Sequence, residues 1–433
     1  MSGLKLAWYG DDFTGASDTL ATLAQAGLRA FLFLDVPSAK QLAAVGDLDA
    51  LGIAGAARAM APDAMRRALE PLARFLAVSG ARVLHYKCCS TFDSAPHVGN
   101  IATAIETLHA PLANPFVPIL GGQPSLGRHC LFGQLFAVSE AGGPAHRIDR
   151  HPTMQHHPVT PMDEADLRRH LRRQGLAPIG LIDWRAYGRP AAELDEMLDG
   201  LLATDATIRP ILLDVGTEAH LGMIGRLLWE RARAAPLLVV GASGVAQALI
   251  DHWQLNRRAR DGRIAPARGP VFLLAGSMSP VNARQIAATG AYVKVPLDAM
   301  RLVQDDPAYV PEIETRIAEL LRDGRHVLAH TAASTGTVAE VQSLLASACA
   351  RLLRRVLERH PVSRVGIAGG DTSSHAVQAL APWGLIWLGQ FGPGVALCRL
   401  RADDPAFDGL EIMLKGGQMG GTDLYDALIA GTP

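Results

Sequence analysis

The amino-acid sequence predicts an α/β fold with two domains, each built on a mostly parallel β-sheet. Short apolar runs of strand length alternate with segments of helical apolar spacing along most of the chain, which is typical of βαβ units. The chain has 433 residues, a length that suits two or three domains. The segment 256–270 is charged, contains Pro and Gly and lacks periodicity, so we expect a linker there. We therefore predict an N-terminal domain over 1–255 and a C-terminal domain over 271–433.

The predicted strands of the N-terminal domain are short apolar runs. They cover 4–9, 30–35, 51–55, 82–87, 118–120, 179–182, 211–214 and 237–241. Segments with helical spacing cover 18–27, 62–79 and 100–108. In the C-terminal domain we expect strands at 271–275 and 364–368 and a strand that ends at Lys415. Because ligands bind at the carboxyl ends of strands in open α/β sheets, the loops after these strands are the candidate binding loops.

The composition argues against several classes of protein. The formal net charge is -1, so nothing indicates nucleic acid as a partner. The five cysteines are odd in number and include no C-x-x-C pair, which disfavours a disulfide framework or a zinc ribbon and favours a reducing compartment. The sequence shows neither a signal-peptide pattern at its start nor an uncharged apolar run of about 18 residues. We therefore expect a cytoplasmic protein without a membrane span.

The first predicted strand is followed by a loop of two glycines and two carboxylates, with the sequence GDDFTG at 10–15. Its glycines let the backbone approach a ligand closely. Asp11 and Asp12 can bind sugar hydroxyls, accept a proton or hold Mg²⁺ through water. The alternative is structural: one aspartate caps the next helix and the other is solvated. The position of the pair at a strand end, together with the motifs below, favours the functional interpretation.

Three further loops after strands carry compact polar sets. Arg58 follows the third strand, and its planar fork suits a carboxylate; the alternative is a surface ion pair. The strand at 82–87 leads into one cation, two hydroxyls and one carboxylate: Lys87, Ser90, Thr91 and Asp93. The alternative role for the two hydroxyls is to cap the following helix. The loop 121–129 is rich in Gly and carries Arg128, so it can hold an anionic ligand or simply turn.

Four loops of the C-terminal half are rich in glycine. They are Gly276-Ser277-Met278-Ser279, Gly369-Gly370-Asp371-Thr372, the turn at 391–395, and Lys415-Gly416-Gly417. Most glycines simply make turns, but several such loops beside a Lys, hydroxyls and helix N-termini indicate a phosphate-rich ligand. The chain contains no G-x-x-x-x-G-K-[ST] motif, which excludes a Walker P-loop. A Rossmann dinucleotide site is disfavoured because no G-x-G-x-x-G follows a strand with a matching acid.

Taken together, these motifs resemble those of the four-carbon acid sugar kinase family over nearly the whole chain. The matching segments are DDFTGA at 11–16, YKCCSTFDS at 86–94, HPVTPM at 157–162, GSMS at 276–279, GGDTS at 369–373 and KGGQMG at 415–420. The resemblance implies a sugar-acid-binding N-terminal domain, an ATP-binding C-terminal domain and an active site in the interdomain cleft. It implies transfer of the γ-phosphoryl group of ATP to the terminal hydroxyl of an acid such as 3-oxo-tetronate, threonate, erythronate or 3-oxo-isoapionate.

The resemblance also implies roles for individual residues. The family's acidic pair corresponds to Asp11 and Asp12 of this chain. Its substrate-binding positions correspond to Arg58, Lys87, Ser90, Thr91 and Asp93. The family's nucleotide-binding positions correspond to Ser277, Ser279, Gly369, Gly370, Asp371, Thr372, Lys415, Gly416 and Gly417. We expect Asp12, with Asp11, to orient the hydroxyl and accept its proton, and Asp371 to hold Mg²⁺ or compete as the base. The ligands of the metal are left open.

This chain departs from the usual family pattern in two places. The family usually has Lys and Ser or Thr just before the substrate-side Arg and Ser after it, where this chain has Ala56, Ala57 and Ala59. The last loop usually has the sequence Lys-Ser-Gly-Asn-Phe-Gly, and 415–420 has KGGQMG instead. The first change makes the substrate pocket less polar, so it bears on which sugar acid fits. The second change affects the contacts of this loop with the base or ribose of the nucleotide.

Two other classes of function stay open at this point. A Mg²⁺-dependent hydrolase using Asp11 and Asp12 would need further carboxylates nearby, and only Asp18 and Asp93 are visible candidates. The second class is a non-catalytic sensor of sugar acid and nucleotide. The retained acidic and basic residues argue against it. The expected partners are a small-molecule sugar acid and ATP, with no nucleic acid and no membrane, and a homodimer is an option.

Overall fold

The computed structural model describes residues 3–139, 142–157, 159–176, 178–203, 206–259, 262–277, 279–331, 339–392 and 394–432. The chain divides into two compact units, Met1–Ala259 and Arg260–Pro433, called the N-terminal and C-terminal units below. Positions 260 and 261 of the predicted linker, and Met278, Pro158 and Pro393 of the predicted motifs, lie outside the described residues. The domain boundaries expected at 255 and 271 stay predictions.

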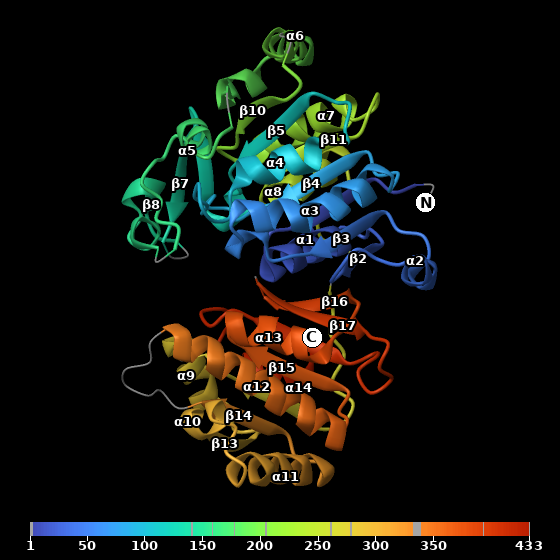
Figure 1. Ribbon diagram of the computed structural model, residues 1–433, viewed down its shortest axis with the longest axis vertical. Coiled ribbons are helices and arrows are strands. Elements are labelled where there is room, and N and C mark those ends of the chain that lie inside the picture. Colours follow the sequence, from blue (N-terminus) through green and yellow to red (C-terminus); the bar gives the residue numbers. More distant parts are fainter. Residues whose placement is uncertain are drawn as a thin grey trace. The chain divides into compact units, whose positions relative to one another are not determined.

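The N-terminal unit contains a parallel sheet with the strand order β2-β3-β1-β4-β11-β5-β10-β9 (Figure 1). The strands are β1 (Leu6–Gly10), β2 (Ala30–Phe33), β3 (Ala50–Ala54), β4 (Val83–Lys87), β5 (Phe116–Gly121), β9 (Gly180–Ile182), β10 (Arg209–Asp214) and β11 (Leu237–Gly241). Every residue of β1, β4 and β11 is buried, as expected for strands covered on both faces. Each strand predicted for this half is present, so its loop predictions can be examined in place.

Helices connect these strands. They are α1 (Phe13–Gln25), α2 (Ala39–Val45), α3 (Pro62–Ala77), α4 (Ile101–His109), α5 (Leu167–Arg173), α6 (Ala191–Leu202), α7 (Leu221–Arg231) and α8 (Gly244–His252). Helix α3 packs on α4, and α8 packs on both α1 and α7. In the sheet order β2-β3-β1-β4, the connection through α1 moves from β1 to β2, and the connection through α3 moves in the opposite direction, from β3 to β4. Because both crossovers are right-handed, the two helices lie on opposite faces of the sheet. The sheet is therefore covered on both sides, which leaves its strand ends as the accessible edge.

A small antiparallel sheet follows β5 and was not predicted. It consists of β6 (Arg128–Leu131), β7 (Gln134–Val138) and β8 (Ala145–Arg147) in that order. Short 3-10 helices lie at Ala57–Ala59, Pro124–Leu126, Ile148–Arg150, Met154–His156, Trp184–Gly188 and Glu218–His220. The Gly-rich loop 121–129 therefore does more than turn, because it leads from the main sheet into this second one.

The C-terminal unit has the strand order β13-β14-β12-β15-β18-β17-β16. The strands are β12 (Val271–Ala275), β13 (Val293–Leu297), β14 (Val327–Thr331), β15 (Arg364–Ala368), β16 (Gly384–Gly392), β17 (Val395–Arg401) and β18 (Glu411–Lys415). The pairs from β13 to β18 are parallel, whereas β17 is antiparallel to both β18 and β16. The predicted tight loop at 391–395 is thus the turn of the β16–β17 hairpin. It lies beside the end of β18, because Val395 pairs with Lys415.

The helices of this unit are α9 (Pro280–Ala288), α10 (Ala299–Val303), α11 (Tyr309–Arg322), α12 (Ala339–Arg359), α13 (Gly370–Leu380) and α14 (Leu424–Ala430). Helix α13 begins at Gly370, the second residue of the double glycine, so Asp371 and Thr372 lie in its first turn. No helix among the described residues is both long and apolar enough to cross a lipid bilayer.

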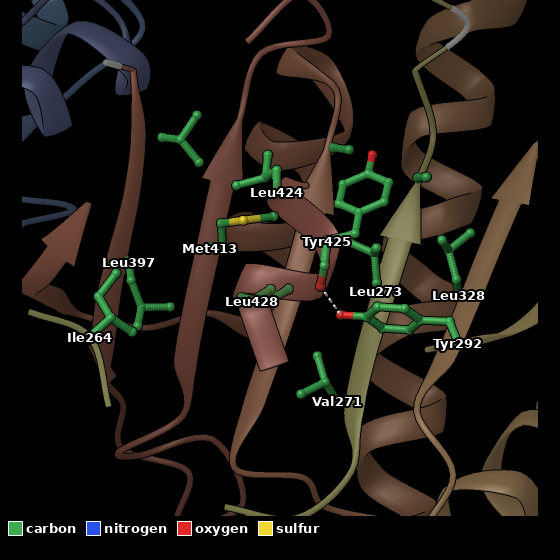
Figure 2. Packing of buried hydrophobic residues seen from close by; sticks show 13 residues of the cluster. Ile264, Val271, Leu273, Tyr292, Leu328, Leu397, Met413, Leu424, Tyr425 and Leu428 are labelled. Atoms are coloured by element: carbon green, nitrogen blue, oxygen red, sulfur yellow. Dashed lines mark hydrogen bonds between the residues drawn. The ribbon is translucent and has the colours of Figure 1, made fainter. Parts of the chain in front are cut away.

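The C-terminal unit has a core between α14 and one face of its sheet. Figure 2 shows Tyr425 and Leu428 of α14 beside Leu273 of β12 and Met413 of β18. The hydroxyl of Tyr292 donates to the carbonyl of Tyr425 at 2.8 Å, which satisfies a polar group inside this apolar cluster. This packing fixes β12 and β18, the strands that lead into two of the Gly-rich loops.

Candidate functional site

The acidic pair lies where β1 gives way to α1. Asp12 is the N-cap of α1, and its Oδ1 accepts a hydrogen bond from the backbone N–H of Gly15 at 2.8 Å. Its Oδ2 makes no hydrogen bond among the described residues. Asp11 is buried, and burial raises the pKa of its carboxyl group although the positive charge of Arg58 opposes that rise. The structural alternative is therefore right about the cap, but Asp12 keeps one oxygen for another partner.

Arg58 joins the two carboxylates. Its Nη2 donates to Asp11 Oδ1 at 2.7 Å and to Asp12 Oδ1 at 2.9 Å, and its Nε donates to Asp11 Oδ2 at 3.2 Å. Burial alone would lower the pKa of Arg58, but the charge of Asp11 raises it above its ordinary value. The alternative of a surface ion pair is wrong, because 5% of the Asp11 side chain and 26% of the Arg58 side chain are exposed. Of the flanking alanines, Ala57 is buried and Ala56 and Ala59 are exposed.

Lys87 ends β4 directly beside this pair. It is buried, and its Nζ donates to the carbonyl oxygen of Cys88 at 2.9 Å. A Cβ placed on Gly15 would lie 2.5 Å from Lys87 Nζ and 2.5 Å from Asp12 Oδ1. The ammonium and the carboxylate therefore approach the first turn of α1 together, and only glycine leaves room for both. The ammonium has donors to spare for an anionic ligand.

The loop after Lys87 brings together two of its three predicted polar residues. Thr91 Oγ1 donates to Asp93 Oδ1 at 2.8 Å, whereas the Ser90 side chain makes no hydrogen bond among the described residues. Burial, followed by the charge of Asp93, raises the pKa of Cys89 to about 11, so Cys89 stays a neutral thiol. The capping alternative for Ser90 and Thr91 is wrong, because Asn100 caps α4.

A polar pair that sequence reasoning did not assign lies at the next strand end. Ser243 follows β11, and its hydroxyl donates to Asp18 Oδ2 on α1. The hydroxyls of Thr19 and Ser243 lie 3.2 Å apart. The small residues at 241–246 are typical of a turn that opens a helix, but no local pattern indicates a partner 225 residues away. Asp18 is thus bound to a hydroxyl rather than grouped with Asp11 and Asp12 as a hydrolase would require.

In the C-terminal unit, three of the predicted loops converge. They follow β12, β15 and β18, which are neighbours in the sheet and run parallel. The N–H groups of Gly276 and Ser277 both donate to the carbonyl of Ala368 at 3.0 Å. A Cβ on Gly417 would lie 2.3 Å from Ser277 Oγ, so the first and last loops touch. Ser279 caps α9, and its hydroxyl donates to the carbonyl of Gly417.

The middle loop has the strained geometry that only glycine adopts easily. Gly369 has a φ of 131°, and its N–H donates to the carbonyl of Lys415 at 3.0 Å. Gly370, Asp371 and Thr372 then form the first turn of α13, whose free N–H groups face the same edge. A Cβ on Gly276 would lie 2.3 Å from Thr372 Oγ1, which shows how closely this turn meets the first loop. The Asp371 side chain is exposed.

Lys415 is the cation of this loop set. It is 2% exposed, and its Nζ has no hydrogen-bond partner among the described residues. Burial lowers its pKa from 10.5 to about 8. The Nζ lies 5.8 Å from the centre of the Tyr425 ring, a weak cation–π contact. A buried ammonium with so little compensation is unfavourable unless a ligand supplies the missing negative charge.

Two residues that hold these loops were not found from the sequence. Gln285 Nε2 donates to the carbonyls of Met419, Gly420 and Gly421 at 3.1, 3.0 and 2.8 Å. Asn282 donates to the Ser277 carbonyl and accepts from the Tyr425 hydroxyl. The sequence indicates this role only weakly, because two amide side chains three residues apart on a helix usually lie on its solvent-exposed face.

The two units therefore offer different chemistry. The strand ends of the N-terminal unit hold a carboxylate with a free oxygen beside two cations, which suits a hydroxyl-bearing anion. The strand ends of the C-terminal unit hold backbone N–H groups, hydroxyls and an unpaired ammonium, which suits phosphate. Among the described residues, no three His, Cys, Asp or Glu side chains gather into a group that could hold a metal ion.

Known families and relatives match both units. Models of a sugar-binding N-terminal domain and a nucleotide-binding C-terminal domain match residues 6–249 and 272–425. A 3-oxo-isoapionate kinase from Paraburkholderia graminis is 36% identical over 447 residues, covering 98% of this chain and 94% of that protein. A 3-oxo-tetronate kinase from Cupriavidus necator is 31% identical over 442 residues, covering 96% of this chain and 94% of that protein.

Solved structures share the fold. One from Salmonella typhimurium LT2 has a TM-score of 0.81 at 25% identity, with 98% of each chain covered. A Haemophilus influenzae protein of the DUF1537 family has a TM-score of 0.79 at 23% identity, again with 98% of each chain covered. The prediction of two α/β domains is thus confirmed. The matches to both domain models and to full-length kinases show that the chain belongs to the four-carbon acid sugar kinase family, a group of carbohydrate phosphotransferases.

Proposed function

We propose that this chain transfers the γ-phosphoryl group of ATP to the terminal hydroxyl of a four-carbon or branched sugar acid. The candidates are 3-oxo-isoapionate, 3-oxo-tetronate, threonate and erythronate. The first two are the acids in the names of the relatives that match this chain. Phosphoryl transfer depends mainly on positioning and charge neutralisation, which is the kind of chemistry that both sets of strand ends can supply.

The observation that carries this proposal is the buried ammonium of Lys415, which has no hydrogen-bond partner in the part of the chain that the structure describes. It lies at the end of β18, in contact with loops that offer backbone N–H groups and the hydroxyls of Ser277 and Ser279. A phosphate chain supplies both the negative charge that Lys415 lacks and acceptors for these donors. We assign Gly369, Gly370 and Thr372 to the β- and γ-phosphates and the other loops to the rest of the nucleotide.

On the acceptor side, we assign the general base to Asp12. Its Oδ2 is free among the described residues, whereas both oxygens of Asp11 are bonded to Arg58. A base needs a free oxygen within hydrogen-bond reach of the proton that it removes. Asp11 then orients Arg58, and Arg58 in turn holds Asp12. Lys87 provides positive charge beside the reacting hydroxyl.

Mg²⁺ fits this arrangement as an ion carried by the nucleotide. It binds in most kinases through one or two carboxylates, water and the substrate phosphates, and it neutralises charge on those phosphates. Asp371, in the first turn of α13, is the carboxylate of the phosphate-side loop. The lack of a three-ligand group among the described residues agrees with a metal that depends on the phosphates.

A coupled ADP-release assay with ATP·Mg²⁺ tests the proposal. The panel contains D-threonate, D-erythronate, the 3-oxo-tetronates and 3-oxo-isoapionate. Release that depends on one acid establishes the kinase activity and its substrate together. Release with none of the acids, in a protein whose melting temperature still rises with ATP, contradicts the substrate assignment and leaves nucleotide binding standing.

A further inference from the structure

One guanidinium at the edge of the N-terminal sheet has no role in the transfer as described above. Arg128 begins β6, and the loop before it leaves the carboxyl end of β5, which is separated from β4 only by β11. The N–H of Gln123 donates to the carbonyl of Arg128 at 2.9 Å, and the N–H of Arg128 donates to the carbonyl of Gln123 at 3.2 Å. This bridge fixes the start of β6 at the same edge as Lys87.

The charge of Arg128 is uncompensated. Its side chain makes one hydrogen bond among the described residues, from Nη1 to the carbonyl of Leu126, and no ion pair. Its Nε is enclosed and has no partner there. Burial lowers the pKa of Arg128. A half-buried guanidinium without a counter-ion among the described residues costs free energy, as expected where the counter-ion is a ligand.

Arg58 is in the opposite situation. Three hydrogen bonds tie it to Asp11 and Asp12, so two carboxylates already share one positive charge. With Lys87 beside them the four side chains carry no net charge, so a further carboxylate bound there would find no uncompensated cation. Arg58 follows β3 and Arg128 follows the loop after β5, and β4 lies between these two strands in the sheet. The loop 88–93 after β4 therefore starts between the strand ends that carry the two guanidinium groups.

We propose that Arg128, rather than Arg58, receives the carboxylate of the sugar acid while the acid's terminal hydroxyl lies at Asp12. This inference rests on the proposed function and adds to it the residue that selects acids over neutral sugars. Side-on pairing of a guanidinium with a carboxylate uses Nε and Nη2, and these are the nitrogens of Arg128 without a bond among the described residues. Ser90 and Thr91 lie on the loop after β4, a strand that stands between β1 and β5 in the sheet.

The test compares Arg128→Gln, Arg128→Lys and the unchanged protein. For the acid that is turned over best, Arg128→Gln should raise KM roughly 10- to 100-fold, the usual cost of a hydrogen-bonded charge. The KM for ATP should not change. The preference for the acid over its neutral carboxamide should disappear. Arg128→Lys keeps the charge but loses the fork, so its KM for the acid should fall between the two.

Two matched variants complete the design. Arg147→Gln removes a guanidinium from the same small sheet, but Arg147 is paired with Asp149 at 2.5 Å, so KM for the acid should stay unchanged. Arg58→Gln should lower kcat, because it disturbs the acidic pair. An unchanged KM and acid preference in Arg128→Gln would overturn the inference, as would a KM effect confined to Arg58→Gln.

The outcomes separate the two proposals. If the unchanged protein phosphorylates an acid and the Arg128 variants behave like it, only the inference fails. If the unchanged protein releases no ADP with any acid, the proposed function fails and the inference falls with it. Circular dichroism and ATP binding check that each variant folds, and Arg128→Lys decides the matter if Arg128→Gln does not fold.

Discussion

The two sets of strand ends handle charge in opposite ways. In the N-terminal unit, Asp11 and Asp12 are compensated by Arg58 and by the neighbouring Lys87, and the ligand meets side chains that are already held in place. In the C-terminal unit, the loops consist of glycine and hydroxyl residues around Lys415, whose charge has no partner among the described residues. The first set is ordered by its own ion pairs, whereas the second depends on its ligand for compensation. Removing a charge should therefore have different consequences in the two units.

The largest effect is expected from Asp12→Asn, which tests whether the pre-formed acidic pair performs the chemistry. Loss of a general base should lower kcat by about 10³-fold, while the Kd for ATP changes little. Steady-state kinetics and calorimetry measure the two quantities. Asp63→Asn is the control, because Asp63 is exposed and pairs only with Arg66. Near-normal turnover in Asp12→Asn would make Asp371 the better candidate for the base.

Gly15→Ala tests how closely the acceptor side is packed. The new Cβ would displace Asp12 Oδ1 and Lys87 Nζ, each 2.5 Å away, and a shift of this size should lower kcat/KM for the acid by about 10²-fold. Both groups are the ends of side chains, so the melting temperature should change little. Gly200→Ala in α6 is the control, because nothing lies within 4 Å of its Cβ. Unaltered kinetics in Gly15→Ala would show that this close approach is not needed.

Lys415→Met tests whether the loops of the C-terminal unit depend on a ligand to compensate their charge. Removal of the ammonium should raise the KM for ATP roughly 10- to 100-fold, as for other hydrogen bonds to charged groups. It should also stabilise the ligand-free protein, because an uncompensated buried charge is lost. Urea unfolding and ATP titration measure the two changes. Lys294→Met on β13 is the exposed control. A destabilised variant with unchanged ATP affinity would contradict the proposed role of Lys415.

The smallest effect is a pH dependence of the KM for ATP, which we expect to arise from Lys415 in the C-terminal unit. Because burial lowers the pKa of Lys415 to about 8, the KM for ATP should rise about tenfold between pH 7 and pH 9 as the ammonium loses its proton. This rise should be absent in Lys415→Met. A rise of equal size in both proteins would assign the titration to another group.

Stability should follow the same titration with a definite sign. The unfolded chain keeps the proton of Lys415 up to about pH 10.5, whereas the folded protein releases it near pH 8. The unfolded state therefore binds more protons between these values, and the free energy of unfolding should increase with pH across that window. Urea denaturation of the unchanged protein and of Lys415→Met at pH 7.5 and pH 10 isolates this contribution.

Much of the fold could be predicted because its strands are short apolar runs bounded by turn residues. The runs at 82–87 and 237–241 agree with β4 and β11 to within one residue. The small antiparallel sheet could not be predicted, since alternation in strands as short as Ala145–Arg147 is too brief to recognise. The start of α13 could not be located from local composition, because Gly370 and Asp371 are residues typical of loops although they form its first turn.

The candidate site was predicted as a set of residue types but not as a set of contacts. Asp11 and Arg58 are 47 residues apart, and their pairing follows from the adjacency of β1 and β3, which no local pattern encodes. For the same reason, the sequence suggested Arg58 as a free fork for a ligand. Gln285 and Asn282 were missed because their partners are backbone carbonyls, and a carbonyl leaves no trace in the sequence.

The sheet order has a consequence for when each set of strand ends is complete during synthesis. Asp11, Arg58 and Lys87 lie on or after β1, β3 and β4, which are neighbours in the sheet and leave the ribosome early. In the C-terminal unit, β18 lies between β15 and β17, so the sheet stays open at its centre until residues 411–415 have been made. The N-terminal sheet closes once β11, between β4 and β5, has been made, which is well before β18. Since domains fold as units during translation, the N-terminal strand ends should be complete first. A chain cut short after the N-terminal unit would then carry the acceptor-side residues without those assigned to the nucleotide.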